Sequence, residues 1–200
     1  MNDFLPKGYE TPEIPSHYME LEEGQNTFRI LSRAIVGYEW WVDGENGRKP
    51  VRVRTADEVP EEVKNAVENR ARAKHFWAFT VYNYQTKSIQ VLEIKQQTIM
   101  RAIEAFLKNP KWGNPQRYDL IIEKVKTGSR DWDVEYSVIP EPPTQLDAGI
   151  AELAKMVPVR LEAMYEGEDP FAVTDEAGEK VKNGKGGRDT TASRRTRIYS

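Results

Sequence analysis

The order of apolar and polar residues between positions 75 and 109 predicts a β-hairpin followed by one amphipathic helix. Residues 75–84 (HFWAFTVYNY) contain five aromatic and two β-branched residues, a composition typical of strands. A polar break at 85–87 separates them from a second β-rich run at 88–94, so the two runs predict a hairpin. After residue 97 the apolar spacing becomes helical, and one face of this helix carries Ile99, Ile103, Phe106 and Leu107.

Further strand patterns lie on both sides of this unit. They predict strands at residues 27–42, 48–54, 118–126 and 132–139. Gly37 interrupts the first of these strands, as a bend or bulge in a barrel strand requires. We interpret two tryptophans as structural: Trp112 follows the helix end, and Trp132 shares a strand face with apolar residues.

These elements predict a mainly β fold, a five-stranded OB-fold barrel with one helix between strands 3 and 4. The bent segment 27–42 is strand 1, and strands 2 to 5 are the two hairpins at 75–94 and 118–139. Residues 43–74 form a charged insertion in the 1–2 loop, with a short strand at 48–54 and a helix starting at Pro60. The expected organisation is an extended N-terminal arm (1–24), an OB-fold nucleic-acid-binding domain (25–143), a C-terminal helix (144–165) and a disordered, flexible tail (166–200).

Composition and charge exclude several classes of function. The chain has no cysteine, hence no disulfide and no thiolate metal site, and its two histidines are too few to suggest zinc. It lacks a phosphate-cradling GxxxxGK[ST] motif, and no apolar run reaches the roughly 18 residues of a membrane span. We therefore expect a soluble, intracellular protein without cofactor or metal. The net charge is −3, yet residues 24–140 hold 19 bases and 15 acids, which gives a mildly basic central body.

Several stretches of the chain carry a family resemblance when taken in order. They are FRILS and GYEWW, then KPVRVR, HFWAFTVYNY, IKQQTIMRAI and NPKWGNPQRYDLIIEKVKTGSRDWDVEYSV. Over roughly residues 26–143 the chain resembles the single-stranded DNA-binding proteins of tailed bacteriophages. The resemblance implies an OB-fold protein that coats unwound DNA during phage DNA replication and recombination, in the cytoplasm of an infected bacterium, without catalytic residues.

Sequence-tolerant binding of single strands needs cations that follow the phosphates and aromatic rings that stack on bases. The predicted strand at 75–84 places Phe76, Tyr82 and Tyr84 on its even face, and we expect this face to bind DNA while the odd face packs in the core. The strand at 48–54 adds basic residues beside it. The predicted binding residues are Arg48, Lys49, Arg52, Arg54, Tyr38, Trp40, Trp41, Phe76, Tyr82, Tyr84, Lys87 and Arg130.

Two other functions remain as alternatives. Glu93 and Lys95 match the Glu-x-Lys half of a metal-dependent nuclease site, but we expect no strand-borne acid at a suitable upstream position to complete it. An OB-type adaptor domain that binds a protein partner is the second alternative, and the acidic N-terminal arm and the C-terminal helix would suit it.

The C-terminal tail departs from the family pattern. Single-stranded DNA-binding proteins commonly end in an acidic tail, whereas residues 180–200 hold seven bases and one acid. The acidic block lies before them at 166–179, with Phe171 in its middle. This block could cover the basic groove and offer Phe171 to a replication or recombination protein, or it could be only a solvated linker.

Overall fold

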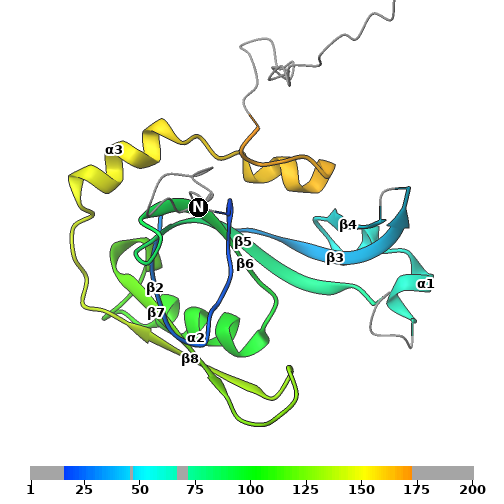
Figure 1. Ribbon diagram of the computed structural model, residues 1–200, viewed down its shortest axis with the longest axis horizontal. Coiled ribbons are helices and arrows are strands. Elements are labelled where there is room, and N and C mark those ends of the chain that lie inside the picture. Colours follow the sequence, from blue (N-terminus) through cyan, green and yellow to red (C-terminus); the bar gives the residue numbers. More distant parts are fainter. Residues whose placement is uncertain (1–15, 46, 67–71, 173–200) are drawn as a thin grey trace, which may run out of the picture.

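A mixed β-sheet dominates the computed structural model, which describes residues 16–45, 47–66 and 72–172 (Figure 1). The predicted mainly β class is therefore confirmed. The strands are β1 (Tyr18–Met19), β2 (Gly24–Ile30), β3 (Ile35–Gly44), β4 (Gly47–Val53), β5 (Lys74–Asn83), β6 (Ser88–Ile94), β7 (Asp119–Lys126) and β8 (Val134–Pro140). The helices are α1 (Glu61–Lys64), α2 (Gln97–Lys108) and α3 (Ala148–Met156), with 3-10 turns η1 (Ala56–Glu58), η2 (Pro115–Arg117) and η3 (Leu161–Glu166). In the described ranges, no helix has the length and apolar character needed to cross a bilayer.

The sheet has eight strands, where the sequence predicted a five-stranded barrel and one short strand in the insertion. Its order is β1-β6-β5-β2-β7-β8, and β3 pairs with both β4 and β5. The predicted bent strand 27–42 is split at residues 31–34 into β2 and β3, which both pair with β5. Strand β4 is the short strand predicted at 48–54, and the unpredicted β1 accounts for the remaining difference. The two ends of the order, β1 and β8, do not pair with each other in the described residues, so the sheet is not closed.

Strand β5 is buried on both of its faces. Phe79 and Val81 point into the main core, which also contains the buried side chains of β2, β7 and α2. Phe76 and Ala78, on the other face, are completely buried in a second cluster with Leu161 of η3 and its neighbours. The predicted core face of this strand is therefore present, but the even face that we expected to be open is covered at its centre.

Helix α2 begins and ends where the apolar spacing predicted. Ile99 and Ile103 are buried against the sheet, whereas Leu107 is 55% exposed at the end of the helix. Trp112 follows the helix and packs edge-on against Phe106, with ring centroids 6.4 Å apart. Its predicted structural role is confirmed.

The β3–β4 hairpin projects from the curled part of the sheet together with the first half of β5 (Figure 1). Gly37 lies just before β3 begins to pair with β4, and a Cβ atom there would collide with the carbonyl oxygen of Val53. The helix predicted from Pro60 onwards is much shorter than expected. Residues 55–66 form only η1 and α1, and residues 67–71 lie outside the described residues.

The chain after β8 returns to the sheet. Asp147 caps α3 by accepting hydrogen bonds from the backbone N–H groups of Gly149 and Ile150. Residues 159–172, here called the C-terminal segment, then pack over β5 and include η3. The predicted C-terminal helix (144–165) is shorter than expected, because α3 ends at Met156 and only the 3-10 turn η3 follows it. Packed structure nevertheless continues past the tail boundary expected at 166. Residues 173–200 and 1–15 of the predicted tail and arm lie outside the described residues.

Candidate nucleic-acid interface

The outer face of β5 and β6 is occupied by the C-terminal segment. Met164 is almost completely buried there, and the Tyr165 hydroxyl donates a hydrogen bond of 2.6 Å to the carbonyl oxygen of Val36. The ring of Phe76 lies beneath this segment, 6.3 Å from the ring of Tyr165. The expectation that Phe76 offers an open ring to a base is therefore wrong in this arrangement, because downstream residues cover it.

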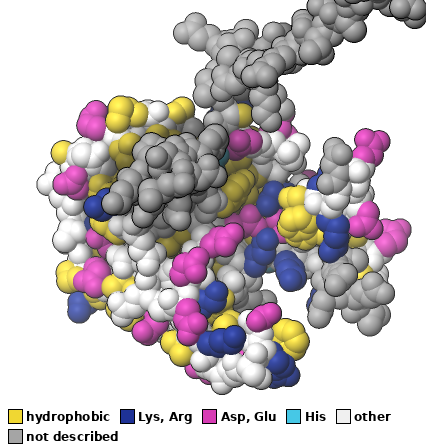
Figure 2. Space-filling model, viewed as in Figure 1, with side chains coloured by type: hydrophobic (Ala, Val, Ile, Leu, Met, Phe, Trp, Pro, Cys, Tyr) yellow, Lys and Arg dark blue, Asp and Glu magenta, His cyan; other side chains and the backbone are white. Residues whose placement is uncertain are grey.

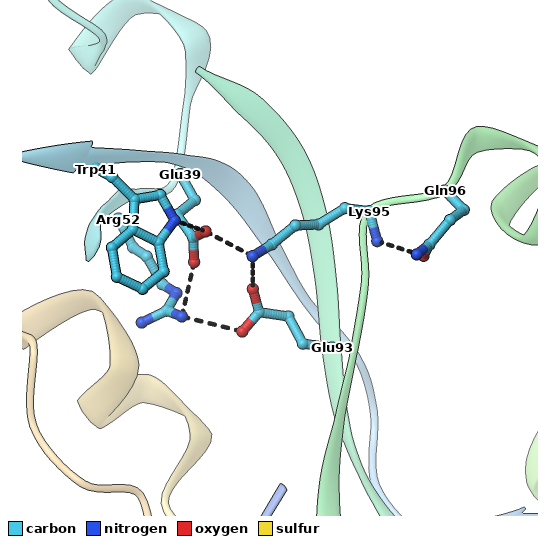
Figure 3. Close-up of polar contacts among 6 residues, drawn as sticks. All are labelled: Glu39, Trp41, Arg52, Glu93, Lys95 and Gln96. Carbon is cyan, nitrogen blue, oxygen red and sulfur yellow. Dashed lines mark hydrogen bonds and ion pairs between the residues drawn. The ribbon is translucent and has the colours of Figure 1, made fainter. Parts of the chain in front are cut away.

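Four charged side chains meet at the base of the β3–β4 hairpin and form what we call the ion-pair cluster (Figure 3). Arg52 of β4 lies 2.7 Å from Glu39 of β3 and 2.9 Å from Glu93 of β6. Lys95, just after β6, lies 2.5 Å from Glu39 and 2.6 Å from Glu93. The cluster contains two positive and two negative groups, and the Arg52 side chain is only 10% exposed. Arg52 is therefore not the solvent-facing phosphate contact that the strand alternation predicted.

Burial and charge act together on the pKa values in this cluster. Burial raises the pKa of Glu39 above 4.5, and the nearby charge of Glu93 raises it further. Burial also disfavours the charged form of Glu93, but Arg52 and Lys95 outweigh it, so the pKa of Glu93 is lowered. For Lys95, burial is outweighed by hydrogen bonds to both carboxylates, and its pKa is raised.

Two features of the ion-pair cluster bear on the nuclease alternative: an additional carboxylate beside Glu93 and Lys95, and the cations that pair with both carboxylates. We expected no acid to complete the pair Glu93 and Lys95, yet Glu39 lies beside both of them. That expectation was wrong because β3 pairs with β5, which in turn pairs with β6. The two carboxylates are nevertheless matched by two cations, and the described part of the chain contains no group of three or more residues suited to hold a metal ion.

Arg54 is also paired. Its guanidinium lies 2.8 Å from the carboxylate of Glu162 and 4.3 Å from the ring centroid of Tyr165. The hydrogen bond from Arg54 to Glu162 raises the pKa of the guanidinium. Arg54 thus connects the hairpin to the C-terminal segment, and its charge is matched by an acid.

One face of the β3–β4 hairpin carries an exposed aromatic ring and an arginine. Trp41 is 42% exposed, and its Nε1 donates a hydrogen bond of 3.0 Å to Glu39. Arg48 donates a hydrogen bond to the carbonyl oxygen of Trp41. Lys49 on the adjacent strand is also exposed, but it pairs with Val42 and therefore points to the opposite face of the hairpin. Trp40 points to the other face of the hairpin and is buried. Contrary to our prediction, its ring is therefore not accessible to a base.

Tyr38 lies on the same face as Trp40. It is half-buried, and its ring centroid is 5.2 Å from that of His75 on β5. The structure therefore separates the three predicted hairpin aromatics. Trp41 is on one face, while Tyr38 and Trp40 are on the other.

The loop between β7 and β8 carries a second exposed tryptophan. Trp132 is 72% exposed, and the guanidinium of Arg130 lies 5.4 Å from its ring centroid. Arg130 also forms an ion pair of 2.8 Å with Asp133. Our interpretation of Trp132 as a structural residue was wrong, because β8 starts only at residue 134 and leaves the ring in the loop. The polar stretch around it, TGSRDWD, was the available signal.

Three other predicted residues lie at the far end of β5. Tyr82 and Tyr84 pack edge-to-face with ring centroids 5.0 Å apart, and Lys87 is exposed in the β5–β6 turn. The Tyr84 hydroxyl donates a hydrogen bond of 3.0 Å to Asp119. Burial and the charge of Asp119 raise the pKa of Tyr84 to about 12. This group is roughly 25 Å along the strand from Lys74, where the β3–β4 hairpin joins β5.

Figure 2 shows basic and apolar side chains gathered on one face of the molecule, both over the β3–β4 hairpin and over the β7–β8 hairpin end. Acidic side chains lie between the two groups. The residues that the structure brings to these two places are Trp41, Arg48, Lys49, Arg130 and Trp132.

Comparisons with known proteins do not place the chain in a family. No protein-family model matches it, and no curated protein sequence is significantly similar to it. The functional argument therefore depends on the residues and the geometry described above.

Proposed function

We propose that this protein binds single-stranded DNA without strong sequence preference, through the β3–β4 hairpin and the β7–β8 loop. One observation carries the proposal. Each of these two hairpins holds a solvent-exposed tryptophan beside an arginine, Trp41 with Arg48 and Trp132 with Arg130. Rings of this kind stack on bases of any sequence, and the neighbouring cations attract phosphates. An exposed indole contributes little to folding, which favours a binding role for both rings.

The topology supports an OB-type barrel as the framework. We assign β2 with β3 as strand 1, β5 and β6 as strands 2 and 3, and β7 and β8 as strands 4 and 5. Helix α2 then lies between strands 3 and 4, and β4 and β1 are additions to the partly open barrel. In this assignment the β3–β4 hairpin is the 1–2 loop and residues 127–133 are the 4–5 loop. These are the loops that contact oligonucleotides in OB folds.

The proposed biological role follows from the same assignment and from the family resemblance of the sequence. The protein would coat and protect unwound DNA during phage DNA replication and recombination, in the cytoplasm of the infected host. It would act as a binding protein rather than an enzyme. Replication or recombination proteins are the proposed partners, through the C-terminal tail.

Titration of the intrinsic tryptophan fluorescence tests the proposal. Oligo-dT should quench the emission at low salt, since stacking brings bases against exposed indoles. Duplex DNA of the same length should bind much more weakly, because its bases are not free to stack, and an oligo-rU titration reports the preference between DNA and RNA. The proposal would be contradicted if, at micromolar protein, oligo-dT left the tryptophan emission unchanged and the anisotropy of labelled oligo-dT also did not change.

A protein-binding function is the second candidate because of one apolar pocket. It has a volume of about 430 Å³ and lies between the β2–β3 connection, β5 and α2. Its lining includes Val36, Trp77 and Leu107, and two of these, Val36 and Leu107, are largely exposed. Leu107→Glu should leave oligo-dT binding unchanged, so loss of a partner with intact DNA binding would assign this pocket to the adaptor function.

A further inference from the structure

The indole of Trp41 is held at one edge while its ring stays accessible. Its Nε1 donates a hydrogen bond to the Glu39 carboxylate at 3.0 Å, although the side chain remains 42% exposed. Glu39 and Trp41 are two residues apart on β3, so both side chains leave the same face of the hairpin. The bond therefore fixes the direction of an exposed ring that would otherwise rotate freely.

The acceptor of this bond is itself immobilised. The Glu39 side chain is only 2% exposed, and both of its oxygens are held by cations. Oε1 lies 2.5 Å from Lys95, and Oε2 lies 2.7 Å from Arg52. Figure 3 shows the indole nitrogen and the Lys95 ammonium converging on the same carboxylate. The orientation of Trp41 is thus determined by Glu39 of β3, Arg52 of β4 and Lys95 just after β6 rather than by its own rotamer preference.

We infer that Glu39 is a positioning residue, which orients the indole of Trp41 so that a base of single-stranded DNA stacks on its free face. This inference rests on the proposed function. It explains how one of the two proposed stacking rings, that of Trp41, is oriented before DNA binds. A ring that is ordered before binding loses less conformational entropy when the base arrives. Immobilisation of one such side chain corresponds to roughly a 2- to 12-fold difference in affinity.

A purely structural role for the ion-pair cluster makes different predictions, and Glu93 provides the matched control. Both acids pair with Arg52 and Lys95, but only Glu39 accepts a hydrogen bond from Trp41. Glu39→Met and Glu93→Met therefore remove the same charge from the same two cations. They differ in whether the indole keeps its acceptor. Glu39→Gln removes the charge but retains an acceptor oxygen for the indole.

The experiment combines oligo-dT affinity with NMR of the Trp41 indole N–H, which is assigned by its absence in Trp41→Ala. Glu39→Met should weaken binding by roughly 2- to 12-fold, and Glu93→Met and Glu39→Gln should not. In the Trp41→Ala background, Glu39→Met should have no further effect. The indole N–H signal should shift and exchange faster in Glu39→Met and remain in place in the other two variants. If Glu39→Met does not fold, Glu39→Asp is the substitute. It keeps the negative charge, but its shorter side chain moves the carboxylate away from the indole N–H, so it should show the same loss of oligo-dT affinity.

Two results would overturn the inference while leaving the proposed function intact. One is equal weakening by Glu39→Met and Glu93→Met that persists in the Trp41→Ala background. The other is an unchanged indole N–H signal in Glu39→Met. Absence of oligo-dT binding by the wild-type chain would instead overturn the proposed function, and the inference with it.

Discussion

The guanidinium of Arg54 and the carboxylate of Glu162 lie 2.8 Å apart and join the β3–β4 hairpin to the C-terminal segment. Both side chains are more than half exposed, so the pair itself contributes little to stability, about 0–1 kcal/mol. Beneath it, Leu161 and Met164 bury apolar surface against β5 and β6. The cover over the outer face of β5 and β6 is therefore fixed mainly by apolar packing.

This difference predicts the effect of two substitutions in η3. Met164→Ala should lower the free energy of unfolding by about 2–5 kcal/mol, because it removes a fully buried side chain and leaves a cavity. Glu162→Ala should lower it by less than about 1 kcal/mol. Urea unfolding measures both values. Comparable losses would mean that the ion pair, and not the packing, fixes the segment.

The two exposed tryptophans should contribute to DNA binding without contributing to stability. Trp41→Ala and Trp132→Ala are each expected to lose about 1–3 kcal/mol of binding free energy for oligo-dT. Their melting temperatures should stay close to that of the wild type, because neither ring is buried. Fluorescence anisotropy with a labelled oligonucleotide measures the affinity. Met156→Ala on α3, another largely exposed position, is the control that should change neither quantity.

Lys49 and Arg52 are basic residues of the same strand but should behave differently. Lys49 is exposed, so Lys49→Ala should make the plot of log affinity against log salt shallower by about 0.7 for one lost phosphate contact. Arg52 already forms ion pairs with Glu39 and Glu93, so its charge is neutralised within the protein. Arg52→Ala should leave the slope unchanged and lower the free energy of unfolding by about 3–5 kcal/mol, because buried carboxylates lose their partner. A shallower slope in Arg52→Ala would return this residue to the interface.

Much of the local structure could be predicted because its signals are local. The spacing of Ile99 and Ile103 indicated α2. Gly37 was expected to mark a bend, but the strand breaks at residues 31–34 and Gly37 lies within β3, where the backbone of Val53 approaches it closely. Pairings between distant residues could not be predicted in the same way. Arg52 alternates with valines, as a solvent-facing strand residue does. The neighbouring sequence does not indicate that Arg52 forms an ion pair with Glu93, 41 positions later.

The same limit explains the misassigned aromatic faces. A strand of alternating apolar residues shows that a face is apolar, but not whether another segment covers it. For Phe76 the covering residues come from η3, far downstream. For Trp132 the error was smaller, since a boundary two residues later moves the ring from a strand face into a loop.

The raised pKa of Glu39 predicts a pH dependence of stability. Between 4.5 and its raised value, the folded state binds more protons at Glu39 than the unfolded state. The contribution of this group to the free energy of unfolding therefore falls as the pH rises through that interval, by about 1.4 kcal/mol per unit of difference. Urea unfolding from pH 4.5 to 8 should show the stability of the wild type relative to Glu39→Gln decreasing with pH. A difference that grows with pH would mean that the pKa of Glu39 is depressed instead.

The charge pattern after Ala172 predicts how two truncations should differ. Residues 180–200 hold seven bases and one acid, whereas residues 173–179 hold three acids and no base. Removal of residues 180–200 should weaken oligo-dT binding and make its salt dependence shallower, because cations that neutralise phosphates are lost. Removal of residues 173–200 also takes away the three acids, so it should restore part of that affinity if the acidic block competes with DNA for basic residues. The comparison is sharpest at low salt, where exposed charges are least screened. Equal affinity of both truncated chains and the full chain under these conditions would assign the tail no electrostatic part in binding.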